Sequence, residues 1–432
     1  MELDRLRFPP PSRQHIEAVQ NARKRLAFER ALRSPYYRGR LDHIVPDRLD
    51  DPEEWSRIPV LTKDELRLIP PEDFAARFSS DAARGDVIDY WRSGGSTGKP
   101  LFYGRSAEDL RASFEGYRRI LHVAGCRAGD VAHVSFPIGI HPLGRLIARA
   151  AESMGVAAIC AGSGNNTPSE MQLELIRTMR PAIWLGMPSY GLQLAAMAEA
   201  QGFDLAAAGV RRLVSAAELL TAAKRRKLET LWGAEVYDHF GCAEGGPLGS
   251  ESSVHDGFHL FDDLFFFEVV DETSHVPLPA GETGLLLMTP LYTNSVTPFL
   301  RWNMGDLGTL MPAGAGGDEL ALFPVFRHAG RTTGFFKVRG VNINHADFEE
   351  FMHRRAAILD FRVAAAASET LDELRVEVEL RRDCDRAAEL GALARAIRAT
   401  FEVTPTVTLV EDGALARAFA EDVKAKRFVD QR

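Results

Sequence analysis

The residues best suited to chemistry in this chain lie between Arg92 and Pro100, where glycines, hydroxyl side chains and one lysine follow one another. Glycine lets a backbone turn tightly, so that its N–H groups can approach a phosphate. The hydroxyls and Lys99 add donors and one positive charge. The run therefore predicts a loop that binds a nucleotide triphosphate, although Pro100 after Lys99 departs from the Walker pattern. An ordinary polar loop is the alternative if the run is considered alone.

Two later segments combine glycine with a carboxylate. Residues 238–246 join the end of an apolar run to a glycine-rich turn that carries Glu244. Residues 301–306 place Asp306 directly after a glycine, where its two oxygens could accept hydrogen bonds from a pair of ribose hydroxyls. Each carboxylate also has a structural alternative, because Glu244 could cap a helical turn and Asp306 could accept backbone N–H groups of a turn.

Two basic segments complete the set. Residues 330–340 contain two basic residues flanked by glycine, beside an inferred domain boundary. Residues 423–427, near the C-terminus, contain Lys424 and Lys426. A solvated charged tail is the alternative for the second segment.

Composition limits the classes of protein that these motifs can belong to. The chain has 432 residues, of which 45% are apolar and 26% charged, which is typical of a globular protein with more than one core. Its net charge of -8 argues against nucleic acid as a partner. No apolar stretch has the length of a membrane span or a signal peptide, so we expect no membrane association. Four scattered cysteines indicate reduced thiols and a cytoplasmic location.

Short apolar runs alternate with amphipathic stretches between residues 129 and 240. This alternation predicts βαβ units and a parallel sheet, whose ligands bind at the carboxyl ends of the strands. The expected strands are Asp130–Phe136, Val156–Ala161, Ala182–Met187, Arg211–Ala216 and Ala234–Phe240, and the expected helices are Leu143–Met154, Pro168–Met179, Pro188–Gln201 and Thr221–Trp232.

The pattern changes after Gly241. Residues 258–310 contain short β-branched and aromatic runs separated by turn residues, which predicts hairpins. A small α+β domain is predicted from about Gly334 onwards. Its expected helices are Ala346–Ala357 and Ala387–Phe401, and its expected strands are Phe361–Ala367, Leu374–Leu380 and Thr406–Val410.

Taken in order, the motifs resemble those of the phenylacetate–CoA ligase family, within the adenylate-forming acyl-CoA synthetase superfamily. Residues 93–100 match its phosphate loop S-S-G-T-T-G-K-P, with Gly94 and Ser96 substituted. Residues 240–244 match its adenine-site turn Y-G-x-S/T-E, and residues 301–306 match its ribose motif R-Y-R-T-G-D. Residues 330–342 match its hinge G-R-x-D-x-x-I-x-x-R-G-V-N, and residues 423–430 match its tail G-K-A-x-R-V-x-D. The resemblance covers essentially the whole chain.

The resemblance implies an α/β fold. A large N-terminal adenylation domain, residues 1–331, would contain the parallel βαβ sheet and a β-rich subdomain. A small mobile C-terminal α+β domain, residues 332–432, would carry the catalytic lysine. The family also implies ATP, Mg²⁺ and coenzyme A as cofactors, and it favours a homodimer.

The resemblance also assigns roles to individual residues. Glu244 and Thr97 would hold Mg²⁺, and Lys424 would reach the bridging oxygen of the α-phosphate, with Lys426 as its competitor. The remaining ATP contacts are expected from the phosphate loop (Ser93, Gly95, Ser96, Thr97, Gly98, Lys99), from residues beside adenine (Ala216, Ala217, Glu218, Asp238, His239, Phe240, Gly241) and from residues near the ribose (Asp306, Arg327, Arg331).

The implied activity is that of an ATP-dependent carboxylate–CoA ligase. Carboxylate and ATP would give an acyl-adenylate and pyrophosphate, and the CoA thiol would then displace AMP. No covalent protein nucleophile is needed, which agrees with the absence of a convincing Ser-His-Asp or Cys-His pattern. The acid is expected to be aromatic, because the candidate pocket suits a flat apolar ring; its residues are Phe136, Pro137, Ile138, His141, Met187, Tyr190, Ala216, Gly241 and Gly245.

Some residues depart from the family pattern. Thr333 stands where the family has its hinge aspartate, and Asn303 and Met304 replace Arg and Thr before Asp306. Two alternatives therefore stay open: an adenylating enzyme that transfers the acyl group to an amine or a carrier-protein thiol, and a degenerate nucleotide-binding protein with a regulatory role. The family sometimes has zinc near His255 and His259, but we expect none here, because a cysteine near Ser252 is missing.

Overall fold

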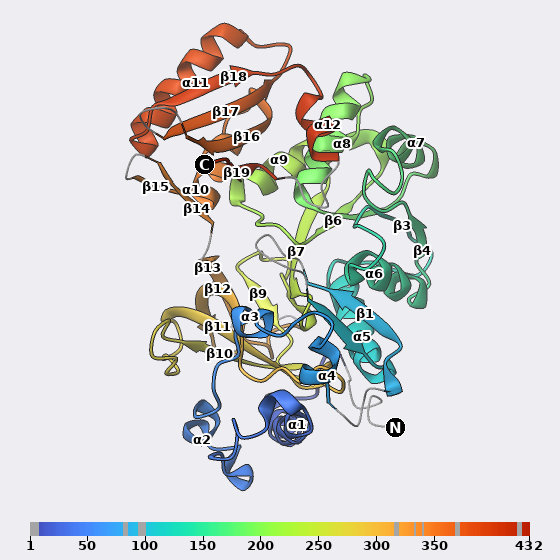
Figure 1. Cartoon of the computed structure of the whole chain (residues 1–432). Helices are drawn as coiled ribbons and strands as arrows, with labels where there is room; N and C mark the ends of the chain where they lie inside the picture. Colours follow the sequence, from blue (N-terminus) through green and yellow to red (C-terminus); the bar gives the residue numbers. More distant parts are fainter. Residues whose placement is uncertain are drawn as a thin grey trace. The chain divides into compact units, whose positions relative to one another are not determined.

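The computed structural model describes residues 8–80, 85–93, 101–314, 319–331, 334–338, 341–367, 372–420 and 426–432 (Figure 1). The contacts within the chain divide it into two compact units. The first unit consists of Met1–Gly129, Ile138–Ala158 and Tyr237–Thr332, and the second of Asp130–Pro137, Ile159–Val236 and Thr333–Arg432. The domains expected from the sequence, residues 1–331 and 332–432, stay a prediction. Among the described residues, no helix is long and apolar enough to cross a membrane.

The first unit begins with helices. Ser12 starts the first long helix, because its hydroxyl accepts a hydrogen bond from the backbone N–H of His15. Ser106 and Asp109 form a reciprocal capping box at the start of another. The helices are α1 (Arg13–Leu32), α2 (Pro52–Ser56), α3 (Lys63–Arg67), α4 (Phe74–Phe78), α5 (Ala107–Val123) and α6 (Pro142–Ser153), with a hairpin of β1 (Asp89–Arg92) and β2 (Phe102–Arg105) before α5.

An antiparallel array of strands forms the rest of the first unit, as the turn-rich sequence after Gly241 predicts. Asp271 closes one of its turns, because one of its oxygens accepts from the backbone N–H groups of Thr273 and Ser274. The strands lie in the order β10 (Phe265–Val270), β11 (Thr283–Pro290), β12 (Trp302–Met311), β13 (Val325–Arg331), β9 (Phe258–Leu260), β8 (Gly246–Ser250) and β7 (Glu235–Cys242).

The second unit contains the predicted parallel strands. β5 (Ile183–Gly186) pairs in parallel with β3 (Val131–Val134) on one side and with β6 (Arg212–Ser215) on the other. All of β5 is buried, which explains its continuous apolar sequence. The connecting helices are α7 (Ser169–Met179), α8 (Pro188–Ala200) and α9 (Ala222–Trp232), and β4 is Ala157–Cys160. The structure confirms each of these strands and helices within a few residues of the predicted bounds.

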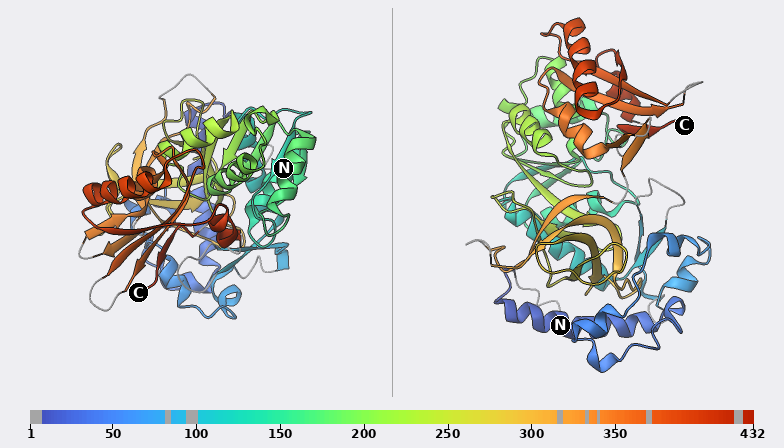
Figure 2. Two further views of the ribbon diagram at one scale, coloured as in Figure 1. Left: turned by 90° about the horizontal axis from the view of Figure 1, so that it is seen from above. Right: turned by 90° about the vertical axis from the view of Figure 1, so that its left-hand side faces the viewer.

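The C-terminal residues of the second unit, coloured orange to red in Figure 2, form a sheet with the order β18-β17-β16-β19, preceded by the β14–β15 hairpin. Phe348, Phe361 and Ile397 belong to its buried core. The strands are β14 (Phe335–Val338), β15 (Val341–Asn344), β16 (Ile358–Ala366), β17 (Glu373–Leu380), β18 (Pro405–Leu409) and β19 (Phe428–Asp430); the helices are α10 (His345–His353), α11 (Arg386–Phe401) and α12 (Ala414–Ala420). The predicted α+β pattern is confirmed here, with α12 and β19 as unpredicted additions.

Candidate active site

Glu244 lies in the tight turn between β7 and β8, not at a helix end, so the helix-cap alternative is wrong. The fully buried side chain of Arg105 holds this turn in place. Its guanidinium donates to the backbone carbonyls of Ala243 (3.0 Å) and Glu244 (2.6 Å). Gly241 is required beside the turn, because a Cβ there would lie 2.7 Å from the carbonyl oxygen of Gly246. The backbone therefore presents the Glu244 side chain in one defined position.

Two donors orient the Glu244 carboxylate, whose side chain is only 6% exposed. The phenol of Tyr103 donates to Oε1 at 2.9 Å, and the Lys63 ammonium lies 3.5 Å from the same oxygen. Burial and the neighbouring carboxylate both raise the pKa of Tyr103, so the phenol stays protonated and donates. Among the described residues both contacts use Oε1, which leaves Oε2 as the oxygen suited to a cation.

This arrangement fits the magnesium that the sequence implies. Mg²⁺ prefers oxygen ligands and is commonly held by one or two carboxylates together with substrate phosphates. Glu244 supplies such a carboxylate, already oriented by its neighbours. Thr97, the other expected ligand, lies outside the described residues.

Lys63 is a contact of Glu244 to which the sequence assigns no role. It is the first residue of α3, which Thr62 caps together with Glu65. The residue before the cap, Leu61, is tied to β12: its N–H donates to the carbonyl of Arg301 (3.1 Å), and its carbonyl accepts from Asn303 (2.9 Å). The strand that carries Asp306 therefore also positions Lys63. A capping box is visible in the sequence, but the pairing with β12 is not.

Asp306 lies in the strand β12, and both its ribose role and the alternative that it accepts N–H groups of a turn stay predictions. One of its carboxylate oxygens, Oδ1, is 2.9 Å from Nε2 of His328, on the neighbouring strand β13. Both side chains are largely buried, at 7% and 15% exposure. The backbone of Arg331 pairs directly with Asp306 in the same ladder. His328 was not predicted from the sequence, because no motif marks it.

Aromatic rings accompany this pair. Phe240, near the end of β7, stacks on Phe258 at 5.3 Å and packs against Phe326 at 5.7 Å. Its ring is also 6.3 Å from that of His328. These rings form an aromatic cluster beside the Asp306–His328 pair. The role of Phe240 beside adenine stays a prediction.

Other residues that are predicted to contact the nucleotide form hydrogen bonds with backbone groups of the protein. Asp238 accepts from the backbone N–H of His239 (3.1 Å). Arg327 directs its guanidinium to the carbonyl oxygen of Asp256 (3.2 Å), whereas the adjacent residue His328 contacts Asp306. The structure therefore does not bring the Arg327 guanidinium to the Asp306 carboxylate. The nucleotide roles of these residues stay predictions.

Ser93 closes the base of the expected phosphate loop. Its N–H donates to the carbonyl of Leu101 (2.9 Å), and its Oγ accepts from the N–H of Leu101 (3.0 Å). The loop ends are thereby held together at the end of β1. The other predicted contacts lie outside the described residues: Gly95, Ser96, Thr97, Gly98, Lys99 and Lys424 wholly, and Arg331 in its side chain.

In the second unit, residues predicted beside adenine and the acid follow the carboxyl ends of β5 and β6. Glu218 accepts from both the N–H (3.0 Å) and the hydroxyl (2.6 Å) of Ser189, at the start of α8. Ala217 adopts a positive φ of 72°, a strained conformation for a residue with a Cβ and one that is common at functional sites. The phenol of Tyr190 lies 3.0 Å from the Ser169 hydroxyl. Met187 and Ala216, predicted to line the acid pocket, are buried close by.

The predicted acid-pocket residues are distributed over both units. The second unit holds Phe136, Pro137, Met187, Tyr190 and Ala216, and the first holds Ile138, His141, Gly241 and Gly245. Burial raises the pKa of Tyr190 to about 12, so its phenol is neutral near pH 7. Their joint role in acid binding stays a prediction.

The histidines considered for zinc have other partners. Nδ1 of His255 lies 3.2 Å from Glu251, and Nδ1 of His259 lies 3.1 Å from the carbonyl of Leu320. Within the described ranges, no group of three His, Cys, Asp or Glu side chains could hold a metal ion.

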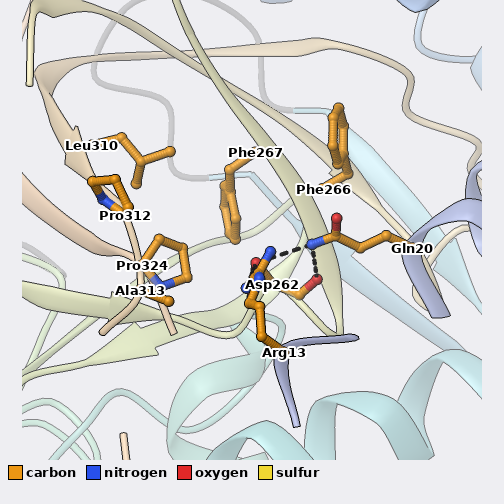
Figure 3. Close-up of a pocket in the computed structure, with 9 residues that line it drawn as sticks. All are labelled: Arg13, Gln20, Asp262, Phe266, Phe267, Leu310, Pro312, Ala313 and Pro324. Carbon is orange, nitrogen blue, oxygen red and sulfur yellow. Dashed lines mark hydrogen bonds and ion pairs between the residues drawn. The ribbon is translucent and has the colours of Figure 1, made fainter. Parts of the chain in front are cut away.

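A separate cavity of about 210 Å³ in the first unit contains none of the predicted site residues (Figure 3). Asp262 is buried at its edge, where Arg13 forms an ion pair with it and Gln20 donates to its Oδ2 at 3.0 Å. Burial raises the pKa of Asp262 to about 7. The side chains around Glu244 and Asp306, not this cavity, define the candidate site.

Comparisons with known proteins agree with the motifs. The family model for the AMP-binding enzyme C-terminal domain matches residues 340–432. A phenylacetate-coenzyme A ligase from Pseudomonas putida is 29% identical over 410 residues, which cover 92% of this chain and 90% of that protein. One from Thermus thermophilus is also 29% identical, over 97% of both chains. These similarities confirm the resemblance predicted from the sequence.

A solved structure confirms the α/β fold. The 2-hydroxyisobutyryl-CoA ligase in the postadenylation state is 23% identical, covers 98% of this chain and 91% of its own, and has a TM-score of 0.83. The same enzyme in complex with CoA in the thioesterification state has a TM-score of 0.68.

Proposed function

We propose that this chain, an AMP-forming acid–thiol ligase similar to phenylacetate–CoA ligases over nearly its whole length, activates an aromatic carboxylic acid with ATP and transfers it to CoA. The observation that carries the proposal is the Glu244 carboxylate, buried in the β7–β8 turn and oriented by Tyr103 and Lys63. A degenerate nucleotide-binding protein would have no need to maintain this costly buried arrangement.

In the first step, the carboxylate of the acid attacks the α-phosphorus of ATP. Asp306 would accept hydrogen bonds from the ribose hydroxyls, while His328 fixes the orientation of the Asp306 carboxylate. Lys63 adds a positive charge beside Glu244, and Lys424 is expected to stabilise charge that develops on the α-phosphate. When bound by Glu244 and Thr97, Mg²⁺ would neutralise charge on the pyrophosphate that leaves.

In the second step, the CoA thiol attacks the acyl-adenylate carbonyl and AMP leaves. A covalent protein intermediate is not needed, and Cys242 is unsuited to form one. Burial and the nearby Glu244 carboxylate raise the pKa of its thiol, so little thiolate exists near neutral pH. We further propose that the C-terminal residues change position between the two steps, as the states recorded for 2-hydroxyisobutyryl-CoA ligase support.

The substrate class is the finer part of the proposal. Apolar residues predominate among the predicted pocket residues, and the curated relatives are phenylacetate ligases. Both observations favour an aryl acid over a short aliphatic one, although the solved relative is named for a small hydroxy acid. We retain a homodimer and a cytoplasmic location as expectations; sedimentation of the purified protein tests the first.

The acceptor is tested by following pyrophosphate, acyl-adenylate and thioester together, with phenylacetate and ATP in the presence and absence of CoA. The proposal predicts thioester that accumulates only with CoA. Acyl-adenylate that forms but is not consumed by CoA would favour an amine or a carrier-protein thiol as acceptor. Glu244→Gln provides the control, because it removes the charge expected to hold Mg²⁺ at almost unchanged shape.

A further inference from the structure

Two lysines of α9 point into the C-terminal residues of the second unit. Nζ of Lys224, whose side chain is 1% exposed, lies 2.5 Å from Oε1 of Glu349 on α10. One helical turn later, Nζ of Lys227 donates to the backbone carbonyls of Ile358 (2.5 Å) and Leu359 (3.2 Å), at the start of β16. The same face of α9 therefore binds both a helix and a strand of the C-terminal sheet.

The start of α9 makes a further contact with α10. The backbone N–H of Ala223 donates to Oε2 of Glu350 at 2.8 Å. This N–H is one of those that a helix leaves without an internal partner, so a carboxylate from another element satisfies it and interacts favourably with the helix dipole. The adjacent residues Glu349 and Glu350 thus both bind the first turn of α9: Glu349 binds a side chain of this turn, and Glu350 binds its backbone.

A second ion pair connects this contact to the C-terminal tail. Arg427, 5% exposed, donates to both carboxylate oxygens of Asp360 on β16, at 2.9 and 3.1 Å. Arg427 follows the predicted catalytic Lys424 by three positions in the sequence. The pair therefore holds the chain at Arg427 against β16, whereas Lys424 itself lies outside the described residues.

These groups form one largely buried cluster of three cations and two carboxylates, which we call the α9 cluster: Lys224, Lys227, Glu349, Asp360 and Arg427. Although burial alone would raise the pKa of Glu349, Lys224 and Arg427 lower it, so this carboxylate stays ionised. Burial also lowers the pKa of Lys227 to about 8. His353 is fully buried beside Glu349, and burial lowers its pKa to about 4, so it adds no charge near pH 7.

A buried ion cluster is a poor device for stability alone. Apolar residues of similar size would hold two elements together at least as well, because ions lose their hydration on burial. Ion pairs add a defined geometry to the contact between two elements. They also allow the contact to separate, because each charged group regains its hydration when the contact opens. An interface that must form in one reaction step and open in another requires both properties.

We propose that the α9 cluster positions the C-terminal residues, and with them the Lys424 segment, for adenylate formation, and that it opens for transfer to CoA. Lys224 and Glu349 are then positioning residues that contact no substrate. The inference rests on the proposed two-step function. It predicts that weakening the cluster impairs the first step selectively.

The test compares Lys224→Met and Glu349→Gln with Arg226→Met, a control on the exposed face of the same helix. ATP–pyrophosphate exchange with phenylacetate reports the first step. Thioester formation from synthetic phenylacetyl-adenylate and CoA reports the second. We expect both cluster variants to lose about tenfold or more in exchange and to stay within about twofold of wild type in transfer, with Arg226→Met unchanged in both. The double variant should lose less than the product of the two single losses, because both substitutions remove the shared contact between Lys224 and Glu349.

Proportional loss of both steps, or loss of neither, would overturn the proposal. Amide hydrogen exchange in α10 of the full chain provides a readout that needs no activity: it should become faster in Glu349→Gln and stay unchanged in Arg226→Met. Unchanged exchange in α10 would also overturn the proposal. If wild type shows no pyrophosphate exchange with any acid, the proposed function fails instead, and the α10 measurement still decides whether the contact exists.

Discussion

The phenol of Tyr103 offers a sharp test of how the Glu244 carboxylate is held. Tyr103→Phe removes the donor that lies 2.9 Å from Oε1 and leaves the buried ring in place. A hydrogen bond to an ionised group contributes about 1.5–3 kcal/mol. A tenfold change in rate corresponds to about 1.4 kcal/mol. When the whole free energy of this hydrogen bond acts in the first step, its removal lowers kcat/KM for ATP–pyrophosphate exchange by roughly 10- to 150-fold. The Mg²⁺ concentration for half-maximal exchange should also rise.

Tyr37→Phe is the matched control. Tyr37 is also buried, and both tyrosines belong to one aromatic group, since Tyr37 packs on Phe78, Phe78 on Phe299, and Phe299 on Tyr103. Within the described part of the chain, the Tyr37 hydroxyl accepts from the N–H of Leu300 (3.3 Å) and contacts no predicted site residue, so its loss should lower the free energy of unfolding without changing the Mg²⁺ dependence. Equal kinetic losses in both variants, or wild-type kinetics in Tyr103→Phe, would refute the reasoning.

Three further predictions follow from single contacts. Asp306→Ala should weaken AMP binding by a few kcal/mol in calorimetry, and His328→Ala by less, because the first removes the acceptor and the second only its orienting partner. Lys63→Met should raise the KM for ATP in the exchange assay more than Lys63→Arg, which keeps the charge. Equal KM values for the two variants would show that the positive charge of Lys63 does not contribute to ATP binding. Burial raises the pKa of Asp262 to about 7, above its unfolded value of about 3.9, so the folded protein binds the extra proton between these values. The free energy of unfolding in urea should therefore fall more steeply from pH 4.5 to 7 in wild type than in Asp262→Asn, and parallel curves would contradict this.

The fold could be predicted where the sequence pattern is local. The strand β5 and helix α8 are found within a few residues of their predicted bounds, because a continuous apolar run followed by a proline-initiated, mostly apolar stretch needs no distant information. The strand β19 was not predicted. It has three residues and pairs in parallel with β16, far earlier in the chain, so nothing in its own sequence marks it.

The candidate site shows the same division. Glycine-rich motifs identified Glu244 and Asp306, because a turn or a close approach of the backbone leaves a trace in the sequence. Their partners Tyr103, Lys63 and His328 leave none, since each reaches its carboxylate from a separate strand or helix; Tyr103 and Glu244 are 141 positions apart. Such contacts depend on how the strands pair, which the motifs do not determine.

The central claim is that the chain activates an aromatic acid as its adenylate, and a panel of acids in the ATP–pyrophosphate exchange assay tests it most directly. Burying an aromatic ring removes on the order of 100 Å² more apolar surface from water than burying the methyl group of acetate. The account therefore predicts a kcat/KM at least about tenfold higher for phenylacetate or benzoate than for acetate. Fastest exchange with acetate or a long fatty acid, or no exchange with any acid, would contradict it.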